Sequence, residues 1–139
     1  MDDKFEQISL KAGFMKHNGG VLFKTISENE YEFKATIKEN HLNAAGITHG
    51  GFIAAFVDAG SGTAAHRSVD QNQCVTISLE LKFISAIKLG QELVGNTKIQ
   101  KKTKSMVFLT CELSVENKIV ATASGVWKIL KLSGAGPGG

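Results

Sequence analysis

One acidic residue and a pair of glycines mark the part of this sequence that could do chemistry. Residues 52–65 contain a single ionisable side chain, Asp58, and they follow directly on His49-Gly50-Gly51. A carboxylate in a confined, poorly solvated place can act as a general base. A helix that begins at the glycines would offer backbone N–H groups to a developing negative charge. The pattern therefore indicates a base next to donors for an oxyanion.

Each of these residues also has an ordinary structural explanation. A lone aspartate on a helix is usually solvated, a Gly-Gly pair is more often a simple turn, and a single histidine such as His49 is more often structural. The solvated explanation fits poorly here, because a surface helix face normally carries Lys and Glu. The residues around Asp58 on its side of the helix are instead Ala54, Ala55, Ser61, Gly62 and Ala65. We therefore expect a helix covered on every side, with Asp58 in a confined position.

The elements that must position these residues follow from the periodicity of the apolar positions. At about 100° per residue, residues 52–65 form a helix with one large apolar side. That side consists of Phe52, Ile53, Phe56, Val57 and Ala64. Six further segments have the alternation or the branched composition of strands. They are residues 21–26, 31–38, 74–84, 92–100, 105–115 and 119–130.

The order of these elements predicts the fold class. The first two strands are joined by a short polar turn and predict a hairpin, and the last four predict an antiparallel meander. A sheet of about six strands must bury one apolar face, and only the long helix can cover it. We therefore expect an α+β fold in which an antiparallel sheet wraps around a long central helix.

The length of 139 residues predicts a single domain over residues 1–132. Residues 1–20 form an N-terminal lead-in, in which 3–16 have a weak helical pattern that ends at Asn18-Gly19-Gly20. Residues 133–139 contain no core-forming side chains. They are expected to be a flexible tail of the kind that an engineered terminus leaves.

Composition argues against several classes of function. With 42% hydrophobic and 21% charged residues, the chain has the composition of a soluble globular protein. It has no apolar run near the roughly 20 residues that span a bilayer, and residues 1–4 lack the charged-then-apolar pattern expected of a secretory signal. Cys74 and Cys111 lack a redox or metal-binding spacing, which fits reduced thiols in a cytoplasmic protein. The net charge of +3 is too small to predict nucleic-acid binding, and the four histidines show no metal-ligand pairing.

The sequence Asn43-x-x-Gly46-x-x-His49-Gly50-Gly51, with Asp58 seven residues after the second glycine, resembles hotdog-fold thioesterases. The resemblance is strongest for the phenylacetate-pathway type within the 4-hydroxybenzoyl-CoA thioesterase superfamily, and it extends from about Val21 to Leu130. It implies the hotdog fold and hydrolysis of an acyl-CoA to a free acid and coenzyme A. Coenzyme A is then part of the substrate, and no cofactor or metal is expected.

The resemblance also implies a role for each residue of the motif. Asp58 corresponds to the catalytic carboxylate, as general base or nucleophile, and Thr76 to a hydroxyl that assists it or the attacking water. Asn43 corresponds to a loop asparagine that holds the surroundings of that water or carboxylate, and His49 to a loop histidine near the thioester carbonyl. The Gly50-Gly51 pair would start the helix, with Gly51 offering the N–H that polarises the carbonyl and Gly50 lying against the substrate.

In such enzymes Asp58 would come from one subunit and Asn43 and His49 from its neighbour, so a homodimer or a dimer of dimers is expected. Basic residues at the entrance would bind the phosphates of coenzyme A. The candidates are Arg67, Lys82, Lys101, Lys102 and Lys104. A lysine-rich turn is also an ordinary solvated hairpin tip. Aryl-acetyl, short, medium and long acyl groups all remain open.

Two other functions compete with hydrolysis. A hotdog protein could bind acyl-CoA as a sensor or carrier without cleaving it, although sensors of this fold usually carry an added DNA-binding domain. A hotdog dehydratase would act on hydroxyacyl thioesters, but such enzymes place a different histidine together with the acidic residue of the helix. The complete set of loop residues and Asp58 favours the thioesterase.

Overall fold

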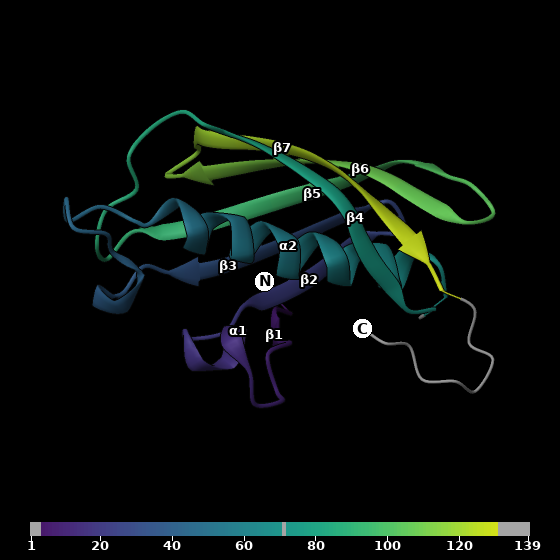
Figure 1. Cartoon of the computed structure of the whole chain (residues 1–139), viewed down its shortest axis with the longest axis horizontal. Coiled ribbons are helices and arrows are strands. Elements are labelled where there is room, and N and C mark those ends of the chain that lie inside the picture. Colours follow the sequence, from purple (N-terminus) through teal and green to yellow (C-terminus); the bar gives the residue numbers. More distant parts are fainter. Residues whose placement is uncertain (1–3, 71, 131–139) are drawn as a thin grey trace.

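The computed structural model describes residues 4–70 and 72–130, which form one long helix against a curved antiparallel sheet (Figure 1). The helix, α2 (Gly50–Ser68), has 19 residues and lies along the concave side of the sheet. The strands are β1 (Glu6–Gln7), β2 (Leu22–Ser27), β3 (Glu30–Thr36), β4 (Cys74–Phe83), β5 (Glu92–Lys102), β6 (Met106–Val115) and β7 (Lys118–Ile129). A short helix α1 (Phe14–His17) and a single 3-10 turn η1 (Glu39–His41) complete the elements. The predicted α+β class is confirmed, with β1 as a seventh strand.

The strand order corrects one prediction from the sequence. The order is β1-β2-β3-β5-β6-β7-β4, so β2 and β3 form the expected hairpin and β5, β6 and β7 form a meander. However, β4 does not pair with β5; it pairs with β7 at the far edge of the sheet. The connection over residues 84–91 explains this, because it is no tight turn and carries Ile87 into the core. The prediction of a four-stranded meander is therefore wrong for β4, and only β5, β6 and β7 form the meander.

The N-terminal lead-in is also less helical than its sequence pattern predicted. Only α1 is helical, and β1 adds two residues to the edge of the sheet beside β2. The apolar residues of this segment do not share one helical side, and Leu10 and Phe14 remain exposed. A longer helix would have had no continuous apolar side to bury.

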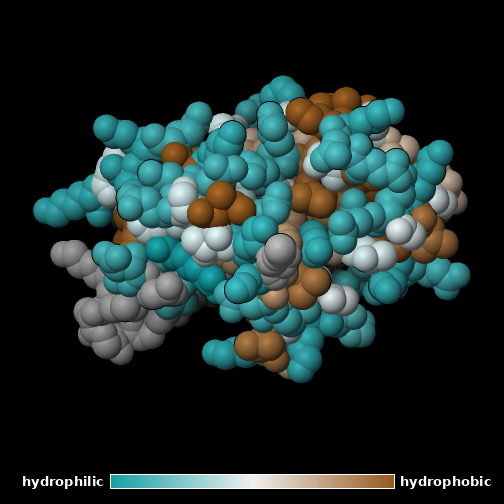
Figure 2. Space-filling model, turned by 180° about the vertical axis from the view of Figure 1, so that it is seen from behind, coloured by the Kyte–Doolittle hydropathy of each residue, from teal (hydrophilic) through white to brown (hydrophobic). Residues whose placement is uncertain are grey.

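The core lies between α2 and the concave face of the sheet. The central strand β6 alternates as expected, with Val107, Leu109, Cys111, Leu113 and Val115 buried. The edge strand β4 does not, since Ile77 and Phe83 on it are exposed. The apolar side of α2 faces the sheet, where Phe33 packs against Phe56 with ring centroids 4.9 Å apart. The face shown in Figure 2 is mostly hydrophilic, with hydrophobic residues in separate small groups. None of the helices in the described ranges combines the length and hydropathy of a membrane-spanning segment.

A small polar cluster is buried between α2 and the sheet. The hydroxyl groups of Ser61 and Thr97 are hydrogen-bonded at 2.8 Å, and both residues are fully buried. The Cys111 thiol lies beside them. Burial raises the pKa of this thiol from 9.0 to about 11, although hydrogen bonds to Thr97 and Ser61 act in the opposite direction. Cys111 is therefore a protonated core residue at neutral pH.

Replacing Cys111 by alanine should remove a loss of stability at high pH. Between pH 9 and about 11 the unfolded chain releases the thiol proton while the folded chain keeps it. The unfolded state then binds fewer protons, so the free energy of unfolding falls as pH rises. Relative to wild type, Cys111→Ala should gain up to about 3 kcal/mol across this window. Denaturant unfolding at about pH 8 and about pH 11 measures the change, and a difference that is independent of pH would contradict the prediction.

Candidate functional site

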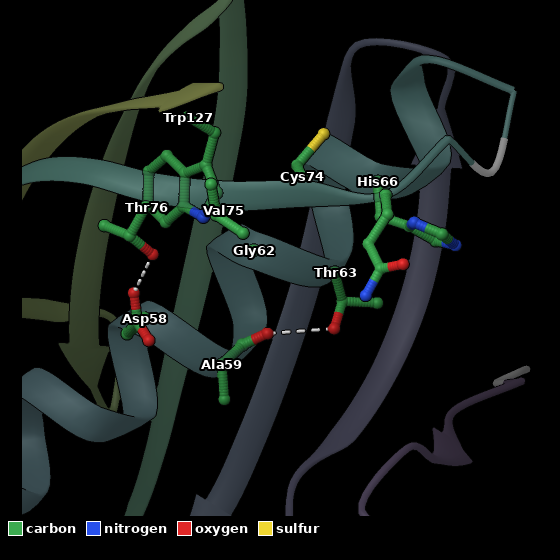
Figure 3. Close-up of a pocket in the computed structure, with 10 residues that line it drawn as sticks. Asp58, Ala59, Gly62, Thr63, His66, Cys74, Val75, Thr76 and Trp127 are labelled. Atoms are coloured by element: carbon green, nitrogen blue, oxygen red, sulfur yellow. Dashed lines mark hydrogen bonds between the residues drawn. The ribbon is translucent and has the colours of Figure 1, made fainter. Parts of the chain in front are cut away.

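A groove between α2 and β4 brings together the acidic residue of the helix and the strand that follows it (Figure 3). It encloses about 510 Å³. Its walls are Asp58, Ala59, Gly62, Thr63 and His66 from α2, Gln73, Cys74, Val75 and Thr76 from the start of β4, and Trp127 from β7. The groove is accessible because small residues of α2, Ala59 and Gly62, line it.

Asp58 and Thr76 form the most specific contact of this groove. The Thr76 hydroxyl donates a hydrogen bond of 2.6 Å to Asp58 Oδ1. Oδ2 of the carboxylate has no hydrogen-bond donor among residues 4–70 and 72–130 and can contact a ligand. The structure thus joins two residues that are 18 positions apart in the sequence and that were both expected at the site.

The exposure of Asp58 shows which side of α2 the single chain leaves uncovered. Asp58 and Thr76 are both exposed in the single chain, so the helix is not covered on every side. The reason is that the sheet covers only one side of α2. The side with Asp58 and Gly62 faces the groove instead. A confined Asp58 therefore requires a second molecule.

The loop before α2 is held by Asn43 and Thr48. Asn43 Oδ1 accepts hydrogen bonds from the backbone N–H groups of Ala45 and Ile47, at 2.9 and 3.3 Å. The Thr48 hydroxyl and N–H both donate to the carbonyl oxygen of Ile87. Since the Asn43 oxygen is used within the loop, only its Nδ2 group is available for a ligand, and the main contribution of Asn43 is to shape the loop.

The start of α2 differs from the expectation in one important detail. The Gly51 N–H donates to His49 Nδ1 at 2.8 Å, so the amide that was expected to polarise a carbonyl is already used. Since Nδ1 is an acceptor, the proton of a neutral His49 ring lies on Nε2, which can donate to a ligand. The Gly50 N–H has no hydrogen-bond acceptor among the residues that the structure describes. Gly50 and His49 Nε2 are therefore the available donors.

These donors and Asp58 are well separated within one chain. Gly51 and Asp58 lie on the same side of α2, but seven residues of helix separate them by about 10 Å along the axis. Asn43 and Gly50 line a second cavity, of about 350 Å³, together with Phe83 and Ile84. One chain therefore does not bring its carboxylate and its loop donors to the same thioester carbonyl.

The basic residues expected to bind phosphate are not gathered at one place. The Arg67 guanidinium forms an ion pair of 2.7 Å with Glu6 and lies over the Phe23 ring, so it is occupied. Lys82 pairs with Glu80 at 3.7 Å on β4. Lys102 donates to the Ser68 carbonyl at 2.9 Å, which places it at the end of α2 nearest to His66 of the groove. Lys101 and Lys104 are exposed near the β5–β6 turn.

Sequence reasoning missed two residues of this region. Trp127 lies in the wall of the groove, although only its inward position in the last strand could have indicated this. His41 is buried, stacks on Phe52 at 3.9 Å, and accepts from the Lys38 N–H, so it is structural. No three His, Cys, Asp or Glu side chains among residues 4–70 and 72–130 are arranged to hold a metal ion.

Comparison with known proteins gives a consistent result. A family model described as the Thioesterase superfamily matches residues 45–122. A provisionally named esterase of Pseudomonas aeruginosa is 34% identical over 94 residues, which are 67% of this chain and 70% of that protein. Acyl-coenzyme A thioesterase 13 of Homo sapiens is 30% identical over 78 residues, 56% of each chain. The structure of the E. coli PaaI protein from the phenylacetic acid degradation operon superposes with a TM-score of 0.76 at 18% identity, over 83% of both chains.

Replacing Gly51 by alanine should displace the His49 ring. The added methyl group would lie 2.9 Å from Nδ1 and 3.0 Å from Cε1 of that ring, which must move and lose its bond to the amide. We expect the free energy of unfolding to fall by about 0.5–2 kcal/mol, the usual cost of losing a helix cap. His49→Ala is the matched variant, because it removes the same bond without a clash. Chemical denaturation of both single variants and the double variant measures the coupling, and strictly additive effects would show that the clash is absent.

Proposed function

Because this chain belongs to the thioesterase superfamily, we propose that it hydrolyses an acyl-CoA to a free acid and coenzyme A. The observation that carries the proposal is the Asp58–Thr76 hydrogen bond at the mouth of the groove. It holds a carboxylate with one free oxygen beside a space large enough for an acyl group. The likeness to a named acyl-coenzyme A thioesterase supports coenzyme A as the thiol of the substrate.

In the proposed reaction, Asp58 activates the nucleophile. As a general base, its free oxygen takes a proton from water while the water oxygen bonds to the thioester carbon; the C–S bond then breaks and the proton passes to the sulfur of coenzyme A. As a nucleophile, the carboxylate bonds to that carbon and the C–S bond breaks, with the thiolate of coenzyme A taking a proton from solvent. Water then hydrolyses the acyl-Asp58 anhydride to the free acid and the original carboxylate. Thr76 positions the carboxylate through its hydroxyl group. The reaction uses water and protein groups and requires no bound cofactor or metal.

The start of α2 would stabilise the negative charge that develops on the carbonyl oxygen. The Gly50 N–H and His49 Nε2 are the donors that the geometry leaves free for this purpose. The dipole of a 19-residue helix favours an anion at the same position. In other enzymes, one oxyanion donor contributes roughly 2.7–4 kcal/mol to transition-state stability. The Gly51 N–H contributes indirectly, by fixing the orientation of the His49 ring.

We propose that a complete site is shared between two copies of this chain. The separation of about 10 Å between loop and carboxylate supports this, since a second copy could bring its own loop close to Asp58. The edge strand β4 also supports it, because Ile77 and Phe83 on it are 50% and 57% exposed. An exposed sheet edge with apolar side chains is a common site of pairing between copies. Lys102 and the exposed Lys101 and Lys104 are candidates for contacts with the phosphates.

Replacing Asp58 by asparagine should reduce kcat by at least about 100-fold, because a general base typically contributes a factor of 10²–10⁴. Release of free thiol from a panel of aromatic and aliphatic acyl-CoAs measures the rate. Asp70→Asn is the control, since Asp70 is exposed beyond α2 and its positive φ of 57° is accepted by asparagine. An Asp58→Asn variant with wild-type turnover would refute the mechanism. Wild-type protein that binds acyl-CoAs tightly but leaves them intact would indicate a carrier instead.

Mixing two inactive variants should restore activity if the site is shared. A dimer of one Asp58→Asn chain and one His49→Ala chain has one site with both defects and one site with none. Random assembly would therefore give about a quarter of the wild-type activity, and the purified mixed dimer about half of it. Co-expression with two affinity tags isolates the mixed dimer for the thiol-release assay. Recovery no greater than the sum of the two parents would mean that each chain uses its own Asp58 and His49.

A further inference from the structure

The only tryptophan of the chain has a buried N–H group without a partner. Trp127 is 1% exposed, yet its Nε1–H has no hydrogen-bond acceptor among the described residues. Buried indole N–H groups usually find an acceptor, and leaving one unpaired costs about 1–3 kcal/mol. A buried N–H group without an acceptor in a folded protein calls for an explanation, and one explanation is that it binds a ligand.

The surroundings of the indole fix which edge faces the groove. Its benzene edge lies against Gly125, where an added Cβ would come within 2.6 Å of Cζ3. The ring packs in a small cluster with Ala65, Val107 and Leu109. On the other edge, a Cβ at Gly62 would lie 3.3 Å from Nε1. The N–H edge is therefore directed at the one position of the α2 wall that lacks a side chain.

This donor lies close to the proposed reaction centre. Trp127 is the direct partner of Thr76 in the β4–β7 pairing, and Thr76 holds Asp58. Gly62 follows Asp58 by one helical turn, about 6 Å along the axis of α2. Figure 3 shows the indole nitrogen of Trp127 on the side of the ring toward Gly62. A group bound there would be a few atoms away from a carbonyl held at Asp58.

Two other polar groups of the groove have partners in the chain. The Thr63 hydroxyl donates to the Ala59 carbonyl at 2.9 Å, and the Cys74 thiol contacts the Asn72 carbonyl at 3.6 Å. Burial raises the pKa of the Cys74 thiol, so it is a weak donor rather than an anion. The indole N–H is thus a fixed donor without an internal acceptor in this wall of the groove.

We infer that Trp127 determines specificity by donating a hydrogen bond to an oxygen atom of the acyl group, and that Gly62 leaves the path to this donor open. The inference rests on the proposed hydrolysis of acyl-CoA and narrows its substrates to acyl groups with an acceptor oxygen near the thioester, such as the 3-oxo group. An acyl chain without that oxygen leaves the buried donor unpaired, which is the situation that discriminates most strongly between substrates.

Two variants remove this hydrogen bond in different ways. Trp127→Phe keeps an aromatic ring but has no N–H, and Gly62→Ala keeps the indole but covers its N–H with a methyl group. Alanine is also the better helix residue, so Gly62→Ala should fold. The measurement is the ratio of kcat/KM for acetoacetyl-CoA to that for butyryl-CoA, which have equal chain lengths. Both variants should lower the wild-type ratio about tenfold, the equivalent of one hydrogen bond of about 1.4 kcal/mol. An unchanged ratio in both variants would overturn the inference.

A binding experiment separates this inference from the proposed hydrolysis. The single tryptophan gives one indole ¹H–¹⁵N resonance, and the Asp58→Asn variant should keep the thioesters intact. Saturating acetoacetyl-CoA should move the indole proton downfield, whereas butyryl-CoA should not. Equal shifts with both thioesters, or none with acetoacetyl-CoA, would overturn the role of Trp127. Wild-type protein that cleaves no member of the acyl-CoA panel would refute the proposed hydrolysis alone, because the resonance still reports on the donor.

Discussion

The close approach of α2 to the sheet is the constraint on which the site depends. The ring of Phe33 lies between two glycines, and a Cβ at Gly60 or Gly95 would come within 2.3 or 2.5 Å of it. This contact fixes the rotation of α2, since only the side with Gly60 can lie against that ring. Asp58 and Gly62 are each two residues away, about 200° around the helix, and so face away from Phe33 and toward the groove beside β4. A packing requirement in the core thus places the carboxylate in the groove.

Much of the secondary structure could be predicted because it is encoded locally. The apolar side of residues 52–65 and the alternation of 74–84 and 105–115 each identify an element without reference to the rest of the chain. The position of β4 could not be predicted in this way. It depends on the connection over residues 84–91, whose Ile87 carbonyl accepts both donors of Thr48 and ties that connection to the loop before α2. Strand order is set by such non-local contacts.

In the site, too, the residue types could be predicted from the sequence, whereas their hydrogen-bond partners could not. The sequence and its resemblance to hotdog thioesterases identified Asp58 and Thr76, which the structure joins by a hydrogen bond. They could not reveal that His49 accepts a hydrogen bond from the Gly51 N–H, or that the Asn43 oxygen accepts hydrogen bonds within its own loop. A residue type states which hydrogen bonds are possible, but only the folded chain decides which of them are made within the protein.

The polar groups without a hydrogen-bond partner in the described part of the chain are those available to a ligand or to a second copy. Among the described residues around the proposed site, these are the Gly50 N–H and His49 Nε2 at the start of α2, one oxygen of Asp58 about two turns further along that helix, and the Trp127 N–H on β7. These donors and this acceptor do not bond to one another in the single chain. The β4 edge and Asp58 are exposed in the single chain, where bulk water competes for the carboxylate. In the proposed dimer a second copy of the chain would cover this region, and the oxygen atoms of the proposed thioester would accept from the donors that the described residues leave without an acceptor.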